Sequence, residues 1–186
     1  MPKITTPRET IVDEFEIVKI LKAVKDDRKL LFAVAIAYKT GARISEILQL
    51  RPKDFSEEGD QWIVSIPTLK QRVLVHGQAP KRVLPITKDA IYDKIIKPEL
   101  EKQTDREKPV VFPYSRQTLS DKLKRRYPDV YFHWFRHSFS TSKSRKVDIF
   151  ELQYALGWKD IRMANTYVHQ EQMTRRLKGL LWYISL

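Results

Sequence analysis

Side chains that could do chemistry together are spread along this chain: Arg43, Lys70, His133, Arg136, Trp158 and Tyr167. They lie in or near three short patterns, TGARISEILQL, HWFRHSF and ALGWKDIRMANTY. A guanidinium group offers a planar set of donors suited to the non-bridging oxygens of a phosphate, and an imidazole can donate or accept a proton. A phenol with a pKa of about 10 becomes a useful nucleophile when nearby cations stabilise its phenolate or a base removes its proton. These residue types therefore suggest a metal-free site that breaks a phosphodiester.

Each pattern taken alone also has an ordinary explanation. An Arg43–Glu46 pair three residues apart is a common surface ion pair that adds little to stability. A tyrosine in a short helix, such as Tyr167, most often belongs to the hydrophobic core. His133 and His137 are four residues apart, as in helical zinc sites. No glutamate stands at position 134 and no third ligand is evident, so the sequence does not favour a metal site.

Composition narrows the class of protein. The chain has 186 residues with 35 Lys+Arg against 23 Asp+Glu, a net charge of +12, which favours a polyanionic partner such as nucleic acid. A ribosomal, membrane-surface or other basic protein is the alternative. The absence of cysteine excludes disulfides and thiolate chemistry. No apolar run approaches the ~18 residues that span a bilayer, and the N-terminus is not a signal peptide, so we expect an intracellular, cytoplasmic location.

The elements that would position these side chains can be predicted from periodicity and breakers. The sequence predicts an amphipathic helix over 13–26, a buried central helix over 28–39 ended by Gly41, and a short helix over 42–50 with Arg43 just inside its start. Short β-branched segments at 61–66, 72–76 and 81–86 predict an antiparallel sheet of two or three strands. Further helices are expected at 87–102, 115–126, 134–146, 148–156, 160–167 and 170–182. The predicted fold class is α+β, mainly α-helical, with one small sheet.

In this order and spacing the patterns closely resemble the catalytic domain of the tyrosine recombinase (phage integrase) family, from about residue 10 to 175. The segment TGxRxSE of the family is matched by Thr40, Gly41, Arg43, Ser45 and Glu46. Its HxLRH box is matched by His133, Arg136 and His137, with Phe135 in place of leucine, and its third position and nucleophile are matched by Trp158 and Tyr167. Each piece is weak alone, and the combination is specific.

The resemblance implies cleavage and rejoining of DNA by transesterification, with no metal or nucleotide cofactor. Tyr167 would attack the phosphorus and leave a 3′-phosphotyrosyl link and a free 5′-hydroxyl. Arg43 and Arg136 would neutralise the charge of the transition state. His133 and Trp158 would bind the phosphate, His133 also assisting proton transfer from the phenol. Glu46 would support Arg43 rather than react.

The resemblance leaves the lysine and the DNA contacts open. The catalytic lysine of the family, which protonates the 5′-oxygen, lies in a β-hairpin that is longer than usual in this chain. Lys70 fits this position best, and Lys81 in KRVLPI is the alternative. A basic segment, DKLKRRY, offers candidate phosphate contacts that could equally form a solvated face: Lys122, Lys124, Arg125 and Arg126.

We expect residues 1–186 to form a single catalytic domain without the N-terminal core-binding domain of the family. A helix within 170–186 would dock in cis, or in trans on a neighbouring protomer. The implied partners are double-stranded DNA and further copies of the chain, which assemble as tetramers on DNA in this family, with no membrane. A type IB topoisomerase with the same chemistry, or a catalytically inactive DNA-binding module, are the alternatives.

Overall fold

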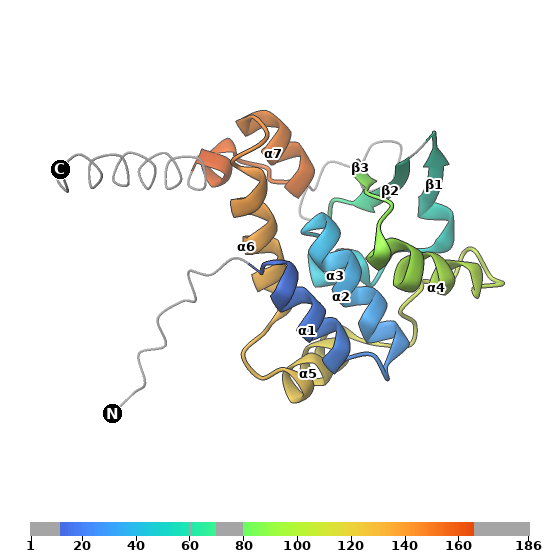
Figure 1. Cartoon of the computed structure of the whole chain (residues 1–186). Helices are drawn as coiled ribbons and strands as arrows, with labels where there is room; N and C mark the ends of the chain where they lie inside the picture. Colours follow the sequence, from blue (N-terminus) through green and yellow to red (C-terminus); the bar gives the residue numbers. More distant parts are fainter. Residues whose placement is uncertain (1–11, 60, 70–79, 166–186) are drawn as a thin grey trace, which may run out of the picture.

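The computed structural model describes residues 12–59, 61–69 and 80–165. Within these ranges the protein is mainly helical with one three-stranded antiparallel sheet, so the predicted fold class is confirmed (Figure 1). The elements are α1 (Glu14–Ala23), α2 (Arg28–Thr40), α3 (Ile44–Ile47), a 3-10 turn (Pro52–Asp54), β1 (Phe55–Glu58), β2 (Gln61–Pro67), β3 (Lys81–Ile86), a π-helical turn (Tyr92–Ile96), α4 (Lys97–Glu101), α5 (Arg116–Arg126), α6 (Phe132–Lys143) and α7 (Ile149–Leu156). Residues 161–165 are also helical.

Helix α2 is the central helix that the sequence predicts. The carboxylate of Asp27 caps its first turn by accepting a hydrogen bond from the backbone N–H of Leu30. All residues from 32 to 37 are buried, because apolar side chains surround the helix almost completely. It ends at Gly41, whose φ of 62° is the left-handed conformation that glycine adopts most readily. Helices α3 and α6 pack against it (Figure 1).

The sheet has the order β1-β2-β3, with Val64 of the central strand opposite Phe55 and Leu84. The predicted strands at 61–66 and 81–86 are confirmed, whereas the one at 72–76 lies outside the described residues. The sequence analysis missed β1, which reads FSEE and exposes three of its four side chains. An edge strand of this kind carries almost no apolar alternation, because only its pairing with β2 makes it a strand.

Among the described residues, the buried apolar side chains form two clusters. The larger surrounds α2 and takes in one face of the sheet and the start of α6. The smaller is made by Leu152, Leu156, Trp158 and Ala164. We call α7 together with residues 157–165 the α7 lobe, and Figure 1 shows it at the C-terminal end of α6, away from α1 and α5.

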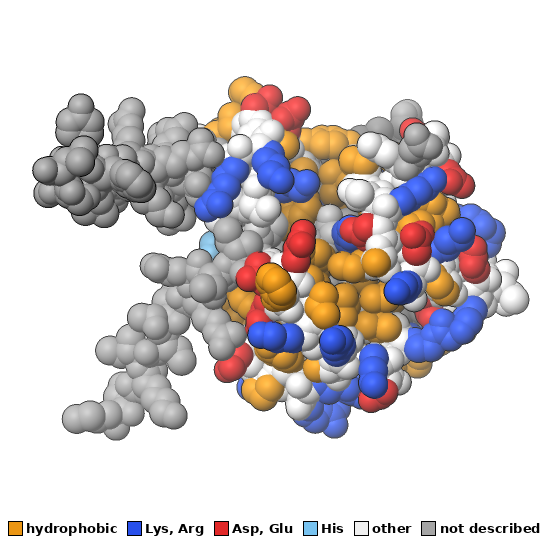
Figure 2. Space-filling model, in the orientation of Figure 1, with side chains coloured by type: hydrophobic (Ala, Val, Ile, Leu, Met, Phe, Trp, Pro, Cys, Tyr) orange, Lys and Arg blue, Asp and Glu red, His pale blue; other side chains and the backbone are white. Residues whose placement is uncertain are grey.

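The face drawn in Figure 2 carries many charged side chains of both signs. Lysine and arginine side chains surround a patch of hydrophobic ones, and acidic side chains lie between them. Phe15 of α1 is 82% exposed. No helix among the described residues has the length and apolar character needed to cross a membrane.

Candidate active site

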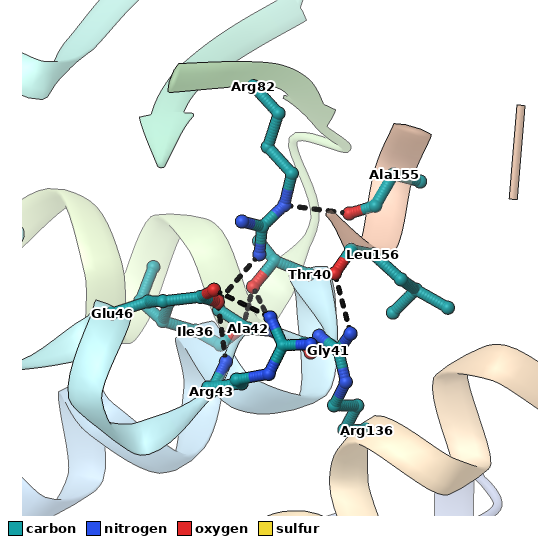
Figure 3. Close-up of polar contacts among 10 residues, drawn as sticks. All are labelled: Ile36, Thr40, Gly41, Ala42, Arg43, Glu46, Arg82, Arg136, Ala155 and Leu156. Atoms are coloured by element: carbon teal, nitrogen blue, oxygen red, sulfur yellow. Dashed lines mark hydrogen bonds and ion pairs between the residues drawn. The ribbon is translucent and has the colours of Figure 1, made fainter. Parts of the chain in front are cut away.

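The site is built where two helices end. Both α2 and α7 end at a glycine in the left-handed conformation, Gly41 and Gly157. The last carbonyl groups of a helix lack partners within the helix and carry its negative dipole end, so they attract a cation. Arg136 of α6 donates Nη1 to the carbonyl oxygen of Gly41 at 2.9 Å and Nη2 to that of Leu156 at 2.5 Å (Figure 3). One side chain, only 3% exposed, therefore ties the two helix ends together.

Arg43 stands two residues beyond the carbonyl group that Arg136 binds. It is the N-cap residue of α3, with an extended backbone at φ −71° and ψ 149°, rather than a residue just inside a helix as the sequence analysis placed it. Glu46 accepts hydrogen bonds from the backbone N–H of Arg43 at 2.8 Å and from its Nη1 at 2.9 Å. Glu46 thus orients Arg43 within the TGxRxSE pattern, and its supporting role in catalysis stays a prediction.

Glu46 has a second arginine partner that the sequence analysis missed. Arg82 of β3 donates Nη2 to Oε2 of Glu46 at 2.8 Å, and the side chains are 2% and 0% exposed (Figure 3). Burial alone would raise the pKa of Glu46, but the hydrogen bond and charge of Arg82, with those of Arg43, outweigh it and hold this pKa below its ordinary value. Glu46 is therefore a carboxylate between two arginines.

A signal for Arg82 was present in the sequence. In KRVLPI, Arg82 alternates with Leu84 and Ile86, and alternate residues of a strand face the same side of a sheet. All three are buried in the structure. An arginine in register with two apolar core positions indicates a buried, paired cation, because a lone buried charge is too costly.

Trp158 follows Gly157 and lies against Arg136. The guanidinium carbon of Arg136 is 5.5 Å from the centre of the Trp158 ring, within the range of a cation–π contact. The ring is 6% exposed and shares the smaller apolar cluster with Ala164. The helical segment 161–165 therefore packs in the same cluster as Trp158. Tyr167 lies two positions further on, outside the described residues.

His133 occupies the exposed beginning of α6, three positions before Arg136. Phe132 and Phe135 are buried in the main core, and Phe139 is partly buried against the smaller cluster, so these side chains form the packed face of the helix. Within the described ranges, the structure contains no group of three or more His, Cys, Asp or Glu residues that could hold a metal ion.

Of the two candidate lysines, the structure describes one. Lys70 lies outside the described residues. Lys81 begins β3, and its Nζ is 2.8 Å from Oδ1 of Asp54, a nearly buried carboxylate. Lys81, Gly157 and Trp158 also line a cavity of about 250 Å³. Lys81 is thus near Trp158, but its ammonium group is paired with a carboxylate.

The four basic candidates on α5 differ in their surroundings. Nζ of Lys122 is 2.7 Å from Oδ2 of Asp27 and 4.8 Å from the centre of the Tyr114 ring. The hydrogen bond to Asp27 raises the pKa of Lys122. Lys122 therefore helps to hold the carboxylate that caps α2, which leaves less of its charge for a phosphate. Lys124 and Arg125 are exposed, and Arg126 is half-buried.

The chain is similar to known proteins over most of its length. The family model described as the phage integrase family matches residues 10–173. The chain belongs to the phage integrase family.

Two curated relatives of the chain are tyrosine recombinases. The chain is 29% identical to tyrosine recombinase XerA of Saccharolobus solfataricus over 176 residues, which is 91% of this chain and 55% of that protein. It is 28% identical to a tyrosine recombinase of Thermosipho africanus, covering 90% of this chain and 60% of the relative. The chain thus spans between 55% and 60% of the length of these relatives.

The fold matches those of solved recombinases. XerH recombinase bound to its difH substrate superposes with a TM-score of 0.66 at 20% identity, covering 89% of this chain and 52% of that one. The catalytic domain of bacteriophage HP1 integrase superposes with a TM-score of 0.59 at 20% identity, covering 86% of this chain and 87% of that one. The predicted tyrosine recombinase catalytic-domain fold is therefore confirmed.

Proposed function

We propose that this chain is the catalytic domain of a site-specific DNA recombinase that cleaves and rejoins strands through a 3′-phosphotyrosyl intermediate. The observation that carries the proposal is the meeting of Arg43, Arg136 and Trp158 at the ends of α2 and α7 in a member of the phage integrase family. Relatives with this fold include a recombinase in complex with its DNA substrate. Double-stranded DNA is accordingly the proposed substrate, and the cell interior the proposed location.

The proposed chemistry assigns one task to each side chain. Tyr167 attacks the phosphorus, and the bond to the 5′-oxygen breaks. Arg43 and Arg136 stabilise the negative charge that develops on the non-bridging oxygens, an effect that is strong when the donors are fixed in advance. Glu46 and two backbone carbonyl groups fix these guanidinium groups. No cofactor is needed, because the phosphotyrosyl bond conserves the energy of the broken phosphodiester.

The remaining roles depend on residues at the rim of this arrangement. His133 binds the phosphate and assists proton transfer from the phenol. Trp158 donates its indole N–H to a phosphate oxygen. Lys70 is the proposed general acid for the 5′-oxygen, with Lys81 as the alternative.

Binding of the whole duplex is part of the proposal. Lys124 and Arg125 are the stronger candidates for phosphate contacts on α5, since both are exposed. Replacing either with glutamine should weaken binding to all duplexes alike and flatten its dependence on salt concentration. Self-assembly on DNA, with the segment 170–186 docking in cis or in trans, completes the proposed recombinase.

A covalent-trapping assay tests the proposal. Nicked duplexes, both candidate attachment sequences and random pools, are incubated with the wild type and with Tyr167→Phe and resolved under denaturing conditions. We expect an adduct with the wild type and none with Tyr167→Phe, while DNA binding stays equal. Tyr131→Phe is the matched control, because Tyr131 is an exposed tyrosine at the N-cap position of α6.

Other outcomes assign the chain to other functions. Relaxation of supercoiled plasmid without exchange between partners would favour a type IB topoisomerase. No adduct on any duplex, with binding intact, would favour an inactive DNA-binding module.

A further inference from the structure

Two adjacent carbonyl groups at the end of α7 accept hydrogen bonds from arginines of other elements. Arg82 of β3 donates Nε to the carbonyl oxygen of Ala155 at 2.9 Å, and Arg136 of α6 donates Nη2 to that of Leu156. Figure 3 shows the two arginines approaching the end of α7 from different elements. Arg136 belongs to the proposed active site, whereas Arg82 contacts residues around that site.

Arg82 also reaches the other side of the site. Its Nη2 binds Glu46, and Glu46 binds both the backbone and the side chain of Arg43. A single buried side chain therefore contacts α3, through Glu46, and α7, through Ala155. Arg43 is the N-cap residue of α3, and Trp158 follows the end of α7.

The guanidinium group of Arg82 lies directly beneath the turn that leads to Trp158. A Cβ atom added to Gly157 would be 3.0 Å from Nη1 of Arg82 and 3.0 Å from Cγ2 of Thr68. Only glycine leaves this space, so the turn and the guanidinium group fit against each other.

The cost of burying Arg82 indicates that stability is not its main contribution. Its Nη1 is buried and has no hydrogen-bond partner among the residues that the structure describes. A buried donor without a partner is unfavourable, and apolar replacements of buried ion pairs are often neutral or stabilising. A buried arginine of this kind is better explained by the positioning of neighbouring groups than by a contribution to the free energy of folding.

We propose that Arg82 is a positioning residue that holds the α7 lobe, and with it Trp158, in register with Arg43. The proposal rests on the proposed function, since its purpose is to keep both groups aimed at one phosphate. Without Arg82, the end of α7 keeps Arg136 alone as its arginine anchor in the described structure, and Arg43 keeps Glu46 but loses the link to α7.

Two variants of Arg82 and one control test this role. Arg82→Met removes both contacts, whereas Arg82→Lys keeps a buried positive charge but cannot reach Glu46 and the Ala155 carbonyl group together. Arg28→Met is the control. It removes an arginine whose Nη2 is 2.8 Å from Oε2 of Glu99, and this pair is not part of the proposed site. Each protein is assayed well below its midpoint of thermal unfolding.

The rate of adduct formation and the affinity for the nicked duplex are measured separately. We expect both Arg82 variants to form the adduct about 10²-fold more slowly at saturating DNA, because small misplacements of catalytic groups have effects of this size. Their dissociation constants for DNA should stay close to that of the wild type, and Arg28→Met should resemble the wild type in both. A wild-type rate at saturating DNA in both Arg82 variants overturns the proposal.

Chemical rescue separates positioning from general damage. Arg82→Ala leaves a hole beside the cavity lined by Thr68, Lys81 and Trp158, through which a guanidinium ion can enter. Tens of millimolar guanidinium chloride should restore part of the Arg82→Ala rate, while sodium chloride at equal ionic strength should not. Loss of rate that follows the loss of folded protein, without rescue, would mean a merely structural arginine.

Hydrogen exchange keeps the test independent of catalysis. The backbone amides of Gly157 and Trp158 are bonded to the last turns of α7. They should exchange faster in Arg82→Met than in Arg28→Met. If the wild type forms no adduct at all, the proposed function fails, and the exchange result alone decides whether Arg82 holds the lobe: faster exchange supports it and unchanged exchange overturns it.

Discussion

Replacing Gly41 with alanine disturbs the point at which the two arginines meet. Gly41 has a φ of 62°, and its carbonyl oxygen accepts the hydrogen bond from Nη1 of Arg136. A Cβ atom at this position would lie 2.9 Å from two ring atoms of Phe139 and 3.0 Å from Cδ2 of Leu156. The substitution therefore combines an unfavourable backbone conformation with a clash between α2, α6 and α7.

The expected cost has two parts. The left-handed backbone costs a non-glycine residue about 1–2 kcal/mol. Forcing an extra methyl group into a packed region costs about 1–3 kcal/mol more. Gly59 offers a matched control, since its φ is 56° and a Cβ atom there has no neighbour within 4 Å. Gly59→Ala should lose only the backbone part, so the two variants should differ by about 1–3 kcal/mol.

Urea unfolding of the wild type and both variants measures these free energies, with equal m-values as the check that the transitions are comparable. Adduct formation on nicked duplexes gives the second readout. Gly41→Ala should slow it well beyond Gly59→Ala, because the displaced carbonyl group no longer orients Arg136. Equal free energies of unfolding for the two variants would refute the packing argument, and equal cleavage rates would refute the link to Arg136.

Three further predictions follow from buried charges and from the lysines. Glu46→Gln should lower the free energy of unfolding in urea by about 3–5 kcal/mol, because it leaves the buried Arg82 without its anion; a loss below about 1 kcal/mol would contradict the importance of this pair. The pKa values of Glu46 and Asp27 are lowered from 4.5 and 3.8, so their contribution to stability is complete above these ordinary values and is lost as pH falls from them through the lower pKa values of the folded protein. The free energy of unfolding should therefore decrease as the pH is lowered below about 4.5, and it should decrease less steeply in Glu46→Gln. Identical slopes for that variant and the wild type would contradict the contribution of Glu46. A substrate with a better 5′ leaving group should rescue cleavage by Lys70→Ala, and rescue of Lys81→Ala instead would reverse the assignment of the general acid.

Much of the fold follows from local sequence. The all-round apolar pattern of residues 28–39 predicts the buried α2, and Gly41 marks its end because few other residues adopt that conformation easily. The i,i+3 spacing of Arg43 and Glu46 predicts their contact, which the structure contains. Family resemblance in three short patterns predicts the fold, since their order and spacing are specific even where overall identity is low.

Other features could not be predicted from local sequence. β1 has no apolar alternation and becomes a strand only by pairing with β2. The predicted helix over 87–102 contains a π-helical turn at Tyr92–Ile96, which no periodicity specified. Lys122 was a candidate for DNA contact, and only the structure shows its pairing with Asp27, 95 positions away.

The sequence by itself determined which residues are the candidates for the chemistry, because residue type and local spacing are enough to name Arg43, His133 and Arg136 and to match a family. The tertiary structure decided what holds them. Arg82 contacts Glu46 across 36 positions, and Arg136 contacts Gly41 across 95. Such contacts depend on how helices and strands pack, and burial gives them their strength, since charges and carbonyl groups removed from water must find partners in the fold.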